Sequence, residues 1–284
     1  MEKVLEGVRV IDLGRYIAGP YCALLLADMG AEVIRVERPG GEPDRTVGAL
    51  TDLGWGVNYI NLARNKKAIT LNLGHADGRE LMKKLVTQSD IIIGAYRGGE
   101  MESMGLGYDV LSRINPGIIL VLVSGFGQTG PYAQRLAFDT IAQAVSGAMS
   151  VSGFPGNPPT KAQVFYSDFG SGVHAALGAM FALYHRKTTG KGQMIDVSLL
   201  DTAVAFMHGI PAEYRVTGRS RRQTGNRTWY TVGDLYRAKD GWVYIFTVTN
   251  HMWQSFIRAI GKEDLGAGMQ SDQERFENQE PKSL

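Results

Sequence analysis

Apolar and polar positions alternate in short blocks through the first half of the chain. Runs rich in Val, Ile and Leu predict strands at residues 8–13, 33–37, 68–73, 91–95 and 118–123. Amphipathic blocks between them predict helices over 20–29 and 77–87, with Pro20 suited to a first helical turn. Apolar strands that alternate with helices predict a Rossmann-like α/β fold, in which helices cover both faces of a parallel sheet. Ligands then bind at the carboxyl ends of the strands.

The pattern changes after residue 200. Before that point we expect a β-rich stretch ending in a short acidic turn near Asp168, a helix over 173–186 and a strand over 194–199. Beyond it we expect, in order, a helix, an arginine-rich solvated linker, a β-hairpin and a second helix, at residues 201–214, 215–228, 233–247 and 250–260. These elements predict a large domain, a helix with a basic linker, and the start of a smaller α+β domain, over residues 1–200, 201–228 and 229–284.

Composition narrows the class of protein only slightly. The chain has 284 residues, of which 44% are hydrophobic, and a net charge of +2, which is too mild to indicate a nucleic-acid partner. Its one cysteine, Cys22, lies in an apolar run and suits a reducing cytoplasm. The histidines show no metal-ligand spacing, so no metal site is expected. No apolar stretch is long enough to span a membrane, and the start does not resemble a secretory signal. We therefore expect a cytoplasmic protein.

Asp168 begins the most chemically suggestive segment, Asp-Phe-Gly-Ser-Gly. One interpretation is structural, because an Asp or Ser at a helix start satisfies unpaired backbone N–H groups. A second interpretation of the fold is a nicotinamide-binding enzyme, since Glu37 ends the second predicted strand where an acidic residue would bind a ribose. The first strand–helix turn, residues 14–20, lacks the G-x-G-x-x-G pattern, which disfavours that alternative.

Six fragments in series resemble the family III CoA-transferases, also called the CaiB/BaiF family. The first two are the opening strand, residues 5–14, and the segment that starts with the Ala-Gly-Pro turn, residues 18–40. Asn-Lys-Lys at 65–67, the Ser-Gly-Phe-Gly segment at 124–131 and the Phe-Asp segment at 138–143 follow. The last is the segment that starts at Asp168, residues 168–199. The resemblance implies a transferase of sulfur-containing groups that moves CoA from an acyl-CoA to a free carboxylic acid. Coenzyme A is then a substrate and not a permanently bound cofactor.

The resemblance also implies roles for two carboxylates. Asp168 matches the family's nucleophile, which attacks the thioester to give an acyl-aspartyl anhydride and then an aspartyl-CoA thioester. An Asp is ionised at neutral pH with an ordinary pKa near ~3.9, and we expect a partly desolvated site with backbone donors for the oxyanion. The glycines on either side of Ser171 are candidates to expose such donors. Asp139 matches an acidic residue near the active carboxylate, so we assign it a supporting role.

The CoA contacts implied by the resemblance are Ile17, Ala18, Arg38, Leu71, Tyr96 and Arg97. Arg38 matches an arginine on the adenosine end of CoA, and Leu71 and Tyr96 match positions that flank the adenine. Basic residues usual in the family near positions 103 and 136 are absent, and Lys66, Lys67 or Arg135 are candidate substitutes. Candidate walls of the acid pocket are Tyr16, Phe154 and Trp229.

Two further expectations follow from the resemblance. The related acyl-CoA racemases carry a His-Asp pair where this chain has Phe138-Asp139, so a transferase is favoured over a racemase. Family members form homodimers interlocked as linked rings, and their pattern usually continues beyond residue 284. Two hypotheses therefore remain open: an active CoA-transferase, and a CoA-binding homologue that is inactive because it is truncated.

Overall fold

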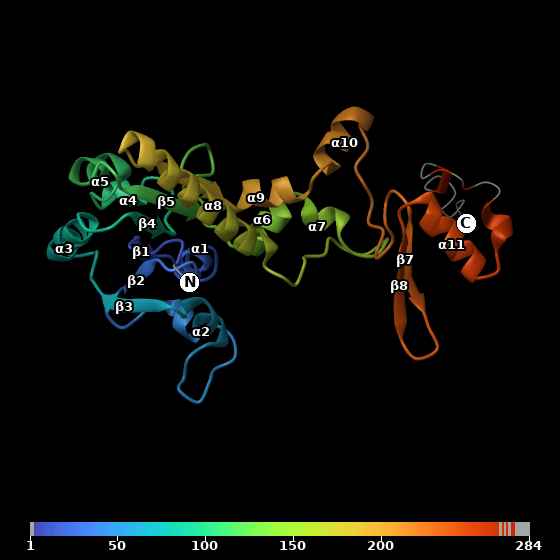
Figure 1. The fold of residues 1–284 in the computed structure, drawn as a ribbon, viewed down its shortest axis with the longest axis horizontal. Coiled ribbons are helices and arrows are strands. Elements are labelled where there is room, and N and C mark those ends of the chain that lie inside the picture. Colours follow the sequence, from blue (N-terminus) through green and yellow to red (C-terminus); the bar gives the residue numbers. More distant parts are fainter. Residues whose placement is uncertain (1–2, 267–268, 270, 272–273, 276–284) are drawn as a thin grey trace. The chain divides into compact units, whose positions relative to one another are not determined.

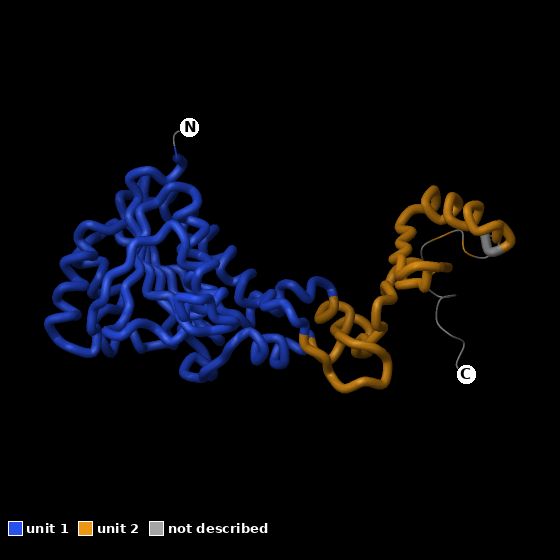
Figure 2. The backbone as a smooth tube through the Cα atoms, turned by 90° about the horizontal axis from the view of Figure 1, so that it is seen from below, with its two compact units in different colours: residues 1–148, 162–209 blue, residues 149–161, 210–284 orange. Residues whose placement is uncertain are grey.

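The computed structural model describes residues 3–266, 269, 271 and 274–275, and these fall into two compact units. The first unit comprises residues 1–148 and 162–209, and the second comprises residues 149–161 and 210–284, as far as each is described (Figure 2). The end of the expected small domain, residues 276–284, lies outside the described part of the chain.

The first unit is built on one sheet of six parallel strands, in the order β3-β2-β1-β4-β5-β6 (Figure 1). The strands are β1 (Arg9–Leu13), β2 (Glu32–Glu37), β3 (Lys66–Thr70), β4 (Ile91–Gly94), β5 (Ile119–Ser124) and β6 (Met194–Ser198). This order is the Rossmann arrangement. Strands β2 and β3 are added on one side of β1, and β4, β5 and β6 are added on its other side, so the strand order reverses between β1 and β4. The predicted α/β class is therefore confirmed, with β3 starting slightly earlier in the sequence than expected.

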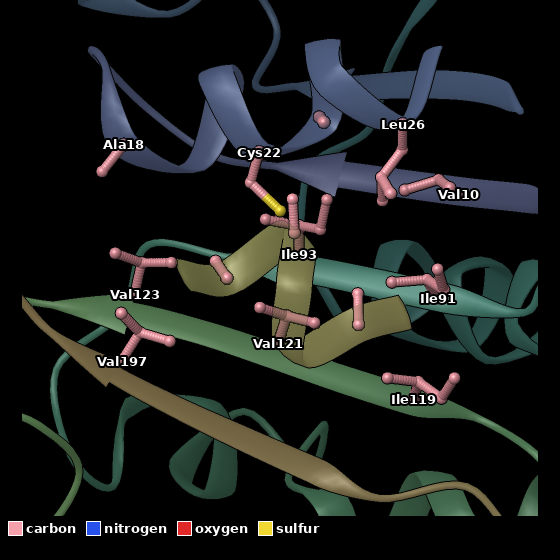
Figure 3. Packing of buried hydrophobic residues seen from close by; sticks show 14 of the residues in the cluster. Val10, Ala18, Cys22, Leu26, Ile91, Ile93, Ile119, Val121, Val123 and Val197 are labelled. Atoms are coloured by element: carbon pink, nitrogen blue, oxygen red, sulfur yellow. The ribbon is translucent and has the colours of Figure 1, made fainter. Parts of the chain in front are cut away.

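Alternate strand residues enter two separate cores. Ile91 and Ile93 pack on one face of the sheet with helix α1 (Ala18–Asp28) (Figure 3). Ile92 packs on the other face. The first face is also covered by α8 (Tyr166–Thr189) and α9 (Leu199–Phe206), and the second by α3 (Ala76–Val86), α4 (Glu100–Ser103) and α5 (Tyr108–Ile114). Successive strand residues point to opposite faces, so this division explains why the runs are apolar throughout.

Helix α8 packs against α1 through its small residues. Ala175, Ala179 and Ala182 are fully buried, and this narrow face allows α1 and α8 to approach closely. The larger apolar side chains of α8 lie mostly on its other side: Val173 is 48% exposed and Tyr184 is 75% exposed. The helical periodicity of these residues therefore marks an outward face and not the core of this unit.

Shorter helices complete the first unit. They are the 3-10 helix η1 (Pro43–Thr46), α2 (Val57–Ala63) and α6 (Asp139–Val145), while α7 (Ala148–Val151) lies at the point where the two units divide. Helix α9 packs against α8 beyond the domain boundary that we expected at residue 200.

The second unit contains the predicted hairpin, β7 (Val232–Arg237) paired antiparallel with β8 (Trp242–Thr247), followed by α11 (Asn250–Ala259) and the 3-10 helix η2 (Glu263–Gly266). The single helix expected over 201–214 was wrong: α9 ends at Phe206 and α10 spans Ile210–Thr217. His208, between them, has a φ of 51°, which is incompatible with a continuous helix. In the basic stretch Arg215, Arg219 and Arg222 are exposed, as expected of a solvated linker. Arg221 differs, because it pairs with Glu213 and lies 3.9 Å from the centre of the Trp229 ring.

Candidate active site

The sheet reverses its strand order between β1 and β4, and a cavity opens at their carboxyl ends. It is the middle one of three adjoining cavities and is called the second cavity below. It has a volume of about 310 Å³ and is lined by Ala18, Gly19, Tyr96 and Arg97, among others. It also reaches Asp168 in the first turn of α8. A crevice at the reversal point is where ligands bind in open α/β sheets.

Two smaller cavities continue it on either side. The first cavity, about 170 Å³, is lined by Arg38 and Leu71 and shares Arg15 and Tyr96 with the second. The third cavity, about 200 Å³, shares Tyr16, Phe138 and Asp168 with the second. Its other lining residues are Ile17, Asp44, Val47, Asn58, Asp139, Thr140 and Phe165. Shared walls join the three cavities into a series that leads from Leu71 to Asp168.

All six predicted CoA-contact residues line this series. Arg38 and Leu71 line the first cavity, and Tyr96 lines the first and second. Ala18 and Arg97 line the second cavity, and Ile17 lines the third. The strand ends and the turns that follow them explain this arrangement: Ile17 follows β1, Arg38 follows β2, Leu71 follows β3 and Tyr96 follows β4.

Several arginines supply positive charge to the first and second cavities. Arg97 pairs with Glu100 and also donates to the Gln134 carbonyl at 3.2 Å. Arg135, one of the candidate substitutes, lines the second cavity and lies 4.0 Å from the centre of the Tyr132 ring. The other two candidates are already paired.

The candidate substitutes Lys66 and Lys67 both pair with acidic residues. The Lys66 side chain is buried and donates to Asp12 at 2.9 Å. Lys67 pairs with Glu32 at 2.6 Å.

Sequence reasoning missed Arg15, which pairs with Glu42 at 3.1 Å and lies 5.7 Å from the centre of the Tyr96 ring. Its place in the turn after the first strand was the signal that could have found it.

Asp168 stands where the second and third cavities meet. Its residue is 9% exposed, and among the described residues no hydrogen bond to its side chain is found. Burial, and after it the charge of Asp139, raise the pKa of Asp168 from 3.8 to about 7. The expected desolvation is therefore present, but the expectation of a fully ionised carboxylate at neutral pH has to be corrected, because burial disfavours the charged form.

Asp139 lies at the start of α6 and is 2% exposed. One of its carboxylate oxygens accepts from the backbone N–H and the hydroxyl of Ser167, both at 2.9 Å, and from the backbone N–H of Asp168 at 3.2 Å. Its other oxygen accepts from the side-chain amide of Gln143. Asp139 thus satisfies the unpaired N–H groups at the start of α8 and holds Asp168 in place.

The segment around Asp168 differs from the expected β-rich stretch and turn, because α8 already begins at Tyr166. Gly170 and Gly172 lie inside this helix, and a Cβ atom at Gly170 would come within 2.4 Å of the Phe206 ring. At Gly172 a Cβ atom would come within 2.8 Å of the Ala18 carbonyl oxygen. The glycines therefore allow close helix packing, and the suggestion that they expose N–H groups to a ligand was wrong, since helical N–H groups bond within the helix.

Backbone donors are present on another element. Helix α1 begins at the second cavity with Ala18 and Gly19, and its N-cap residue, Ile17, makes no side-chain hydrogen bond. The first turn of α1 carries no acidic residue. The N–H groups at the start of a helix have no partners within the helix, so they favour negative charge placed beside them.

The remaining predicted residues are also located. Phe138 lines the second and third cavities, next to Asp168 and Tyr16. Phe154 and Trp229 belong to the second unit and are not among the described residues that line these cavities. Glu37 accepts from Arg35 and from Arg45, each at 2.7 Å, one on each oxygen, which leaves it unsuited to bind a ribose.

No group of three or more His, Cys, Asp or Glu side chains among the described residues is arranged to hold a metal ion. None of the helices formed by those residues has the length and apolar character needed to cross a bilayer.

Comparison with known proteins identifies the family. The profile of CoA-transferase family III matches residues 5–283, so the chain belongs to this family. It is 40% identical over 264 residues to the succinyl-CoA–D-citramalate CoA-transferase of Chloroflexus aurantiacus, covering 92% of this chain and 66% of that one. It is 35% identical over 265 residues to the human succinyl-CoA:glutarate CoA-transferase, covering 93% and 60%. The chain thus spans less than two thirds of the length of either relative.

Solved structures agree with the fold. A CaiB/BaiF family protein from Brucella suis superposes with a TM-score of 0.84 at 30% identity, covering 98% of this chain and 75% of that one. Rv3272 from Mycobacterium tuberculosis superposes with a TM-score of 0.83 at 30% identity, covering 94% and 71%.

Proposed function

We propose that this member of CoA-transferase family III moves CoA from an acyl-CoA to a free carboxylic acid, with Asp168 as the nucleophile. The observation that carries the proposal is the series of three cavities, which contains all six predicted CoA contacts and has a buried carboxyl group where the second and third cavities meet. The relatives named above are both CoA-transferases that use succinyl-CoA, by their names.

The reaction proceeds through two covalent species on Asp168. The carboxylate attacks the thioester carbonyl, the C–S bond breaks, and CoA leaves as a thiolate from an acyl-aspartyl anhydride. The thiolate then attacks the aspartyl carbonyl, which releases the donor acid and leaves an aspartyl-CoA thioester. The acceptor carboxylate repeats these steps in reverse, so that no proton is gained or lost overall.

The surroundings of Asp168 suit each step. The raised pKa makes its carboxylate more basic, and therefore more nucleophilic, than an ordinary aspartate once it is ionised. The N–H groups of Ala18 and Gly19 at the start of α1 are the candidate donors for the oxyanion that forms in each attack. Asp139 supports the reaction indirectly, because it fixes the backbone at Asp168.

The adenosine end of CoA then occupies the first cavity. Arg38 is exposed there, with its Nε donating to the Gly41 carbonyl at 3.0 Å, so its remaining guanidinium N–H groups are oriented for a phosphate. Tyr96, with Arg15 over its ring, offers a flat surface for the base or the linker.

Exchange of isotopically labelled carboxylate into acyl-CoA tests this proposal. We expect the unmodified protein to incorporate label in the absence of any second acyl-CoA, because the aspartyl-CoA intermediate forms reversibly. Asp168→Asn should abolish exchange and retain CoA binding, since an amide cannot form the anhydride. Asp201→Asn, the same change in the first turn of α9 at an exposed position, is the matched control. Exchange at the unmodified rate in Asp168→Asn would refute the role of Asp168.

We also propose that the chain forms a homodimer, as its family suggests. The outward face of α8 supports this, because Leu177 and Phe181 are 48% and 64% exposed and lie beside Val173 and Tyr184 at helical spacing. Sedimentation velocity should give a dimer for the unmodified chain and a monomer for the Leu177→Glu, Phe181→Glu double variant. A monomeric unmodified chain would refute the proposal.

A further inference from the structure

Tyr16 and Phe138 form a wall at the entrance to the third cavity. Their rings meet edge to face, with centres 5.2 Å apart and an interplanar angle of 89°. Both residues line the second and the third cavity, as Asp168 does. The reactive carboxyl group is therefore reached from two sides, and the aromatic pair borders the space on each side.

The backbone of Tyr16 has an unusual conformation. Its φ is 63°, in the left-handed region that a bulky residue rarely adopts. Such a conformation persists only where surrounding contacts hold it. The turn between β1 and α1 must therefore contain a contact that keeps Tyr16 in place.

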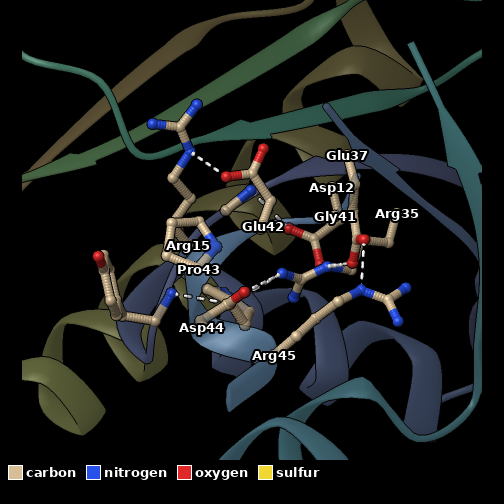
Figure 4. Close-up of polar contacts among 12 residues, drawn as sticks. Asp12, Arg15, Arg35, Glu37, Gly41, Glu42, Pro43, Asp44 and Arg45 are labelled. Atoms are coloured by element: carbon tan, nitrogen blue, oxygen red, sulfur yellow. Dashed lines mark hydrogen bonds and ion pairs between the residues drawn. The ribbon is translucent and has the colours of Figure 1, made fainter. Parts of the chain in front are cut away.

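Asp44 supplies that contact. Its Oδ2 accepts from the backbone N–H of Tyr16 at 3.0 Å, and both of its oxygens accept from Nη2 of Arg35 at 2.8 Å (Figure 4). Asp44 is 4% exposed and Arg35 is 2% exposed, so the pair is screened from water. Burial by itself would lower the pKa of Arg35, but Asp12, Asp44 and Glu37 outweigh it and raise the pKa above its ordinary value.

We propose that Tyr16 determines which acyl groups this site accepts, and that Asp44 is the positioning residue that holds Tyr16 in place. The proposal rests on the function proposed above and assigns the third cavity, of about 200 Å³, to the acyl group. The Tyr16 ring forms one wall of this cavity, so it limits the size of the acyl group that fits there. The apolar side chains of Ile17, Val47 and Phe165 also line the cavity and suit the hydrocarbon part of such a group.

Binding of two thioesters tests the role of the ring. Dissociation constants for acetyl-CoA and phenylacetyl-CoA are measured by calorimetry, and their ratio reports on the acyl pocket because the CoA part is common to both. Tyr16→Gly removes the ring, and glycine adopts a positive φ without strain. We expect it to shift the ratio at least tenfold toward phenylacetyl-CoA, whereas Tyr16→Phe, which keeps the ring, leaves the ratio unchanged. An unchanged ratio in Tyr16→Gly would overturn the proposal.

A double-variant cycle tests whether Asp44 acts through Tyr16. Asp44→Asn weakens the pair with Arg35 and should shift the ratio several-fold in the same direction as Tyr16→Gly. Added to Tyr16→Gly, it should shift the ratio no further, because the ring that Asp44 positions is gone. Asp44 also lines the third cavity itself. Equal shifts in both backgrounds would therefore show that Asp44 acts directly on the acyl group or through the fold, and either result would overturn the positioning role.

A second variant and a measurement without turnover separate the possible outcomes. Asp44→Ser, which keeps a hydroxyl acceptor near the Tyr16 N–H, is examined in the same cycle in case Asp44→Asn does not fold, and the same outcomes support or overturn the proposal. The binding ratio requires no turnover. Failure of the unmodified chain to exchange labelled carboxylate would therefore refute the proposed transfer alone, while an unchanged ratio in Tyr16→Gly would refute the selectivity role alone.

Discussion

The Asp139 carboxylate accepts the backbone N–H of Asp168 at 3.2 Å, and its charge contributes to the raised pKa of the Asp168 side chain. The same acid therefore holds Asp168, the proposed nucleophile, in position and disfavours its ionisation. A helix start would ordinarily stabilise a nearby carboxylate. Here, however, the N–H groups of Ser167 and Asp168 are directed to Asp139.

The raised pKa predicts how stability depends on pH. In the folded state Asp168 has a pKa of about 7, above the ordinary value of 3.8, so between these values the folded protein binds a proton that the unfolded chain lacks. Stability is greatest below pH 4 as far as this group is concerned, and falls as pH rises toward 7. We expect Asp168→Asn to be more stable than the unmodified protein at pH 8 by about 4 kcal/mol, from the difference between 3.8 and about 7 at about 1.4 kcal/mol per pKa unit.

Urea unfolding at several pH values measures this difference. The stability advantage of Asp168→Asn should shrink toward zero near pH 4, where the carboxyl group is protonated in both states. A difference that stays constant between pH 4 and pH 8 would show that ionisation of Asp168 is not its cause.

The same pKa predicts the pH dependence of catalysis. Since the nucleophile must be ionised, kcat/KM should rise with pH, with a midpoint near the pKa of about 7 in the free protein. Asp139→Asn removes a neighbouring negative charge, so the midpoint should move to lower pH. It should stay above the ordinary range, because burial is the larger cause of the shift. A midpoint that moves upward in Asp139→Asn would contradict this arrangement.

Arg38 should matter for the nucleotide end of CoA alone. Arg38→Ala is expected to weaken CoA binding by roughly 1.5–3 kcal/mol, the scale of a hydrogen bond to a charged group. Binding of a pantetheine thioester, which lacks the nucleotide, should stay nearly constant. Arg113→Ala, an exposed arginine on α5 outside all three cavities, is the control. Equal losses for both ligands would place Arg38 away from the nucleotide.

Phe138 predicts that the chain does not act as a racemase. Exchange of the proton next to a thioester needs an acid–base group on each face, and each positioned group contributes about 10²–10⁴-fold. Phe138 borders both cavities at Asp168 and cannot transfer a proton. Deuterium uptake into a 2-methylacyl-CoA, followed by mass spectrometry, should therefore stay at background. Rapid uptake without a carboxylate acceptor would favour the racemase alternative.

The sequence by itself determined the parallel sheet and the places of most site residues. Strands buried on both faces must be apolar throughout, and the residues that follow them, such as Arg38 and Tyr96, must then lie at one edge of the sheet. The resemblance to the family III CoA-transferases added the expected roles of Asp168 and Asp139. The family's motifs include these two acids, whereas hydrophobic periodicity does not distinguish them from other acids.

Only the tertiary structure decided the local details around these residues. The start of α8 was placed too late because Gly170 and Gly172 resemble a loop, yet α9 and α1 pack so closely there that larger residues would clash. Lys66 looked available for a ligand, although Asp12 holds it in the core. The contact between Asp44 and the Tyr16 N–H likewise joins residues with no shared pattern. Such contacts depend on distances between segments remote in the sequence, which local propensity does not encode.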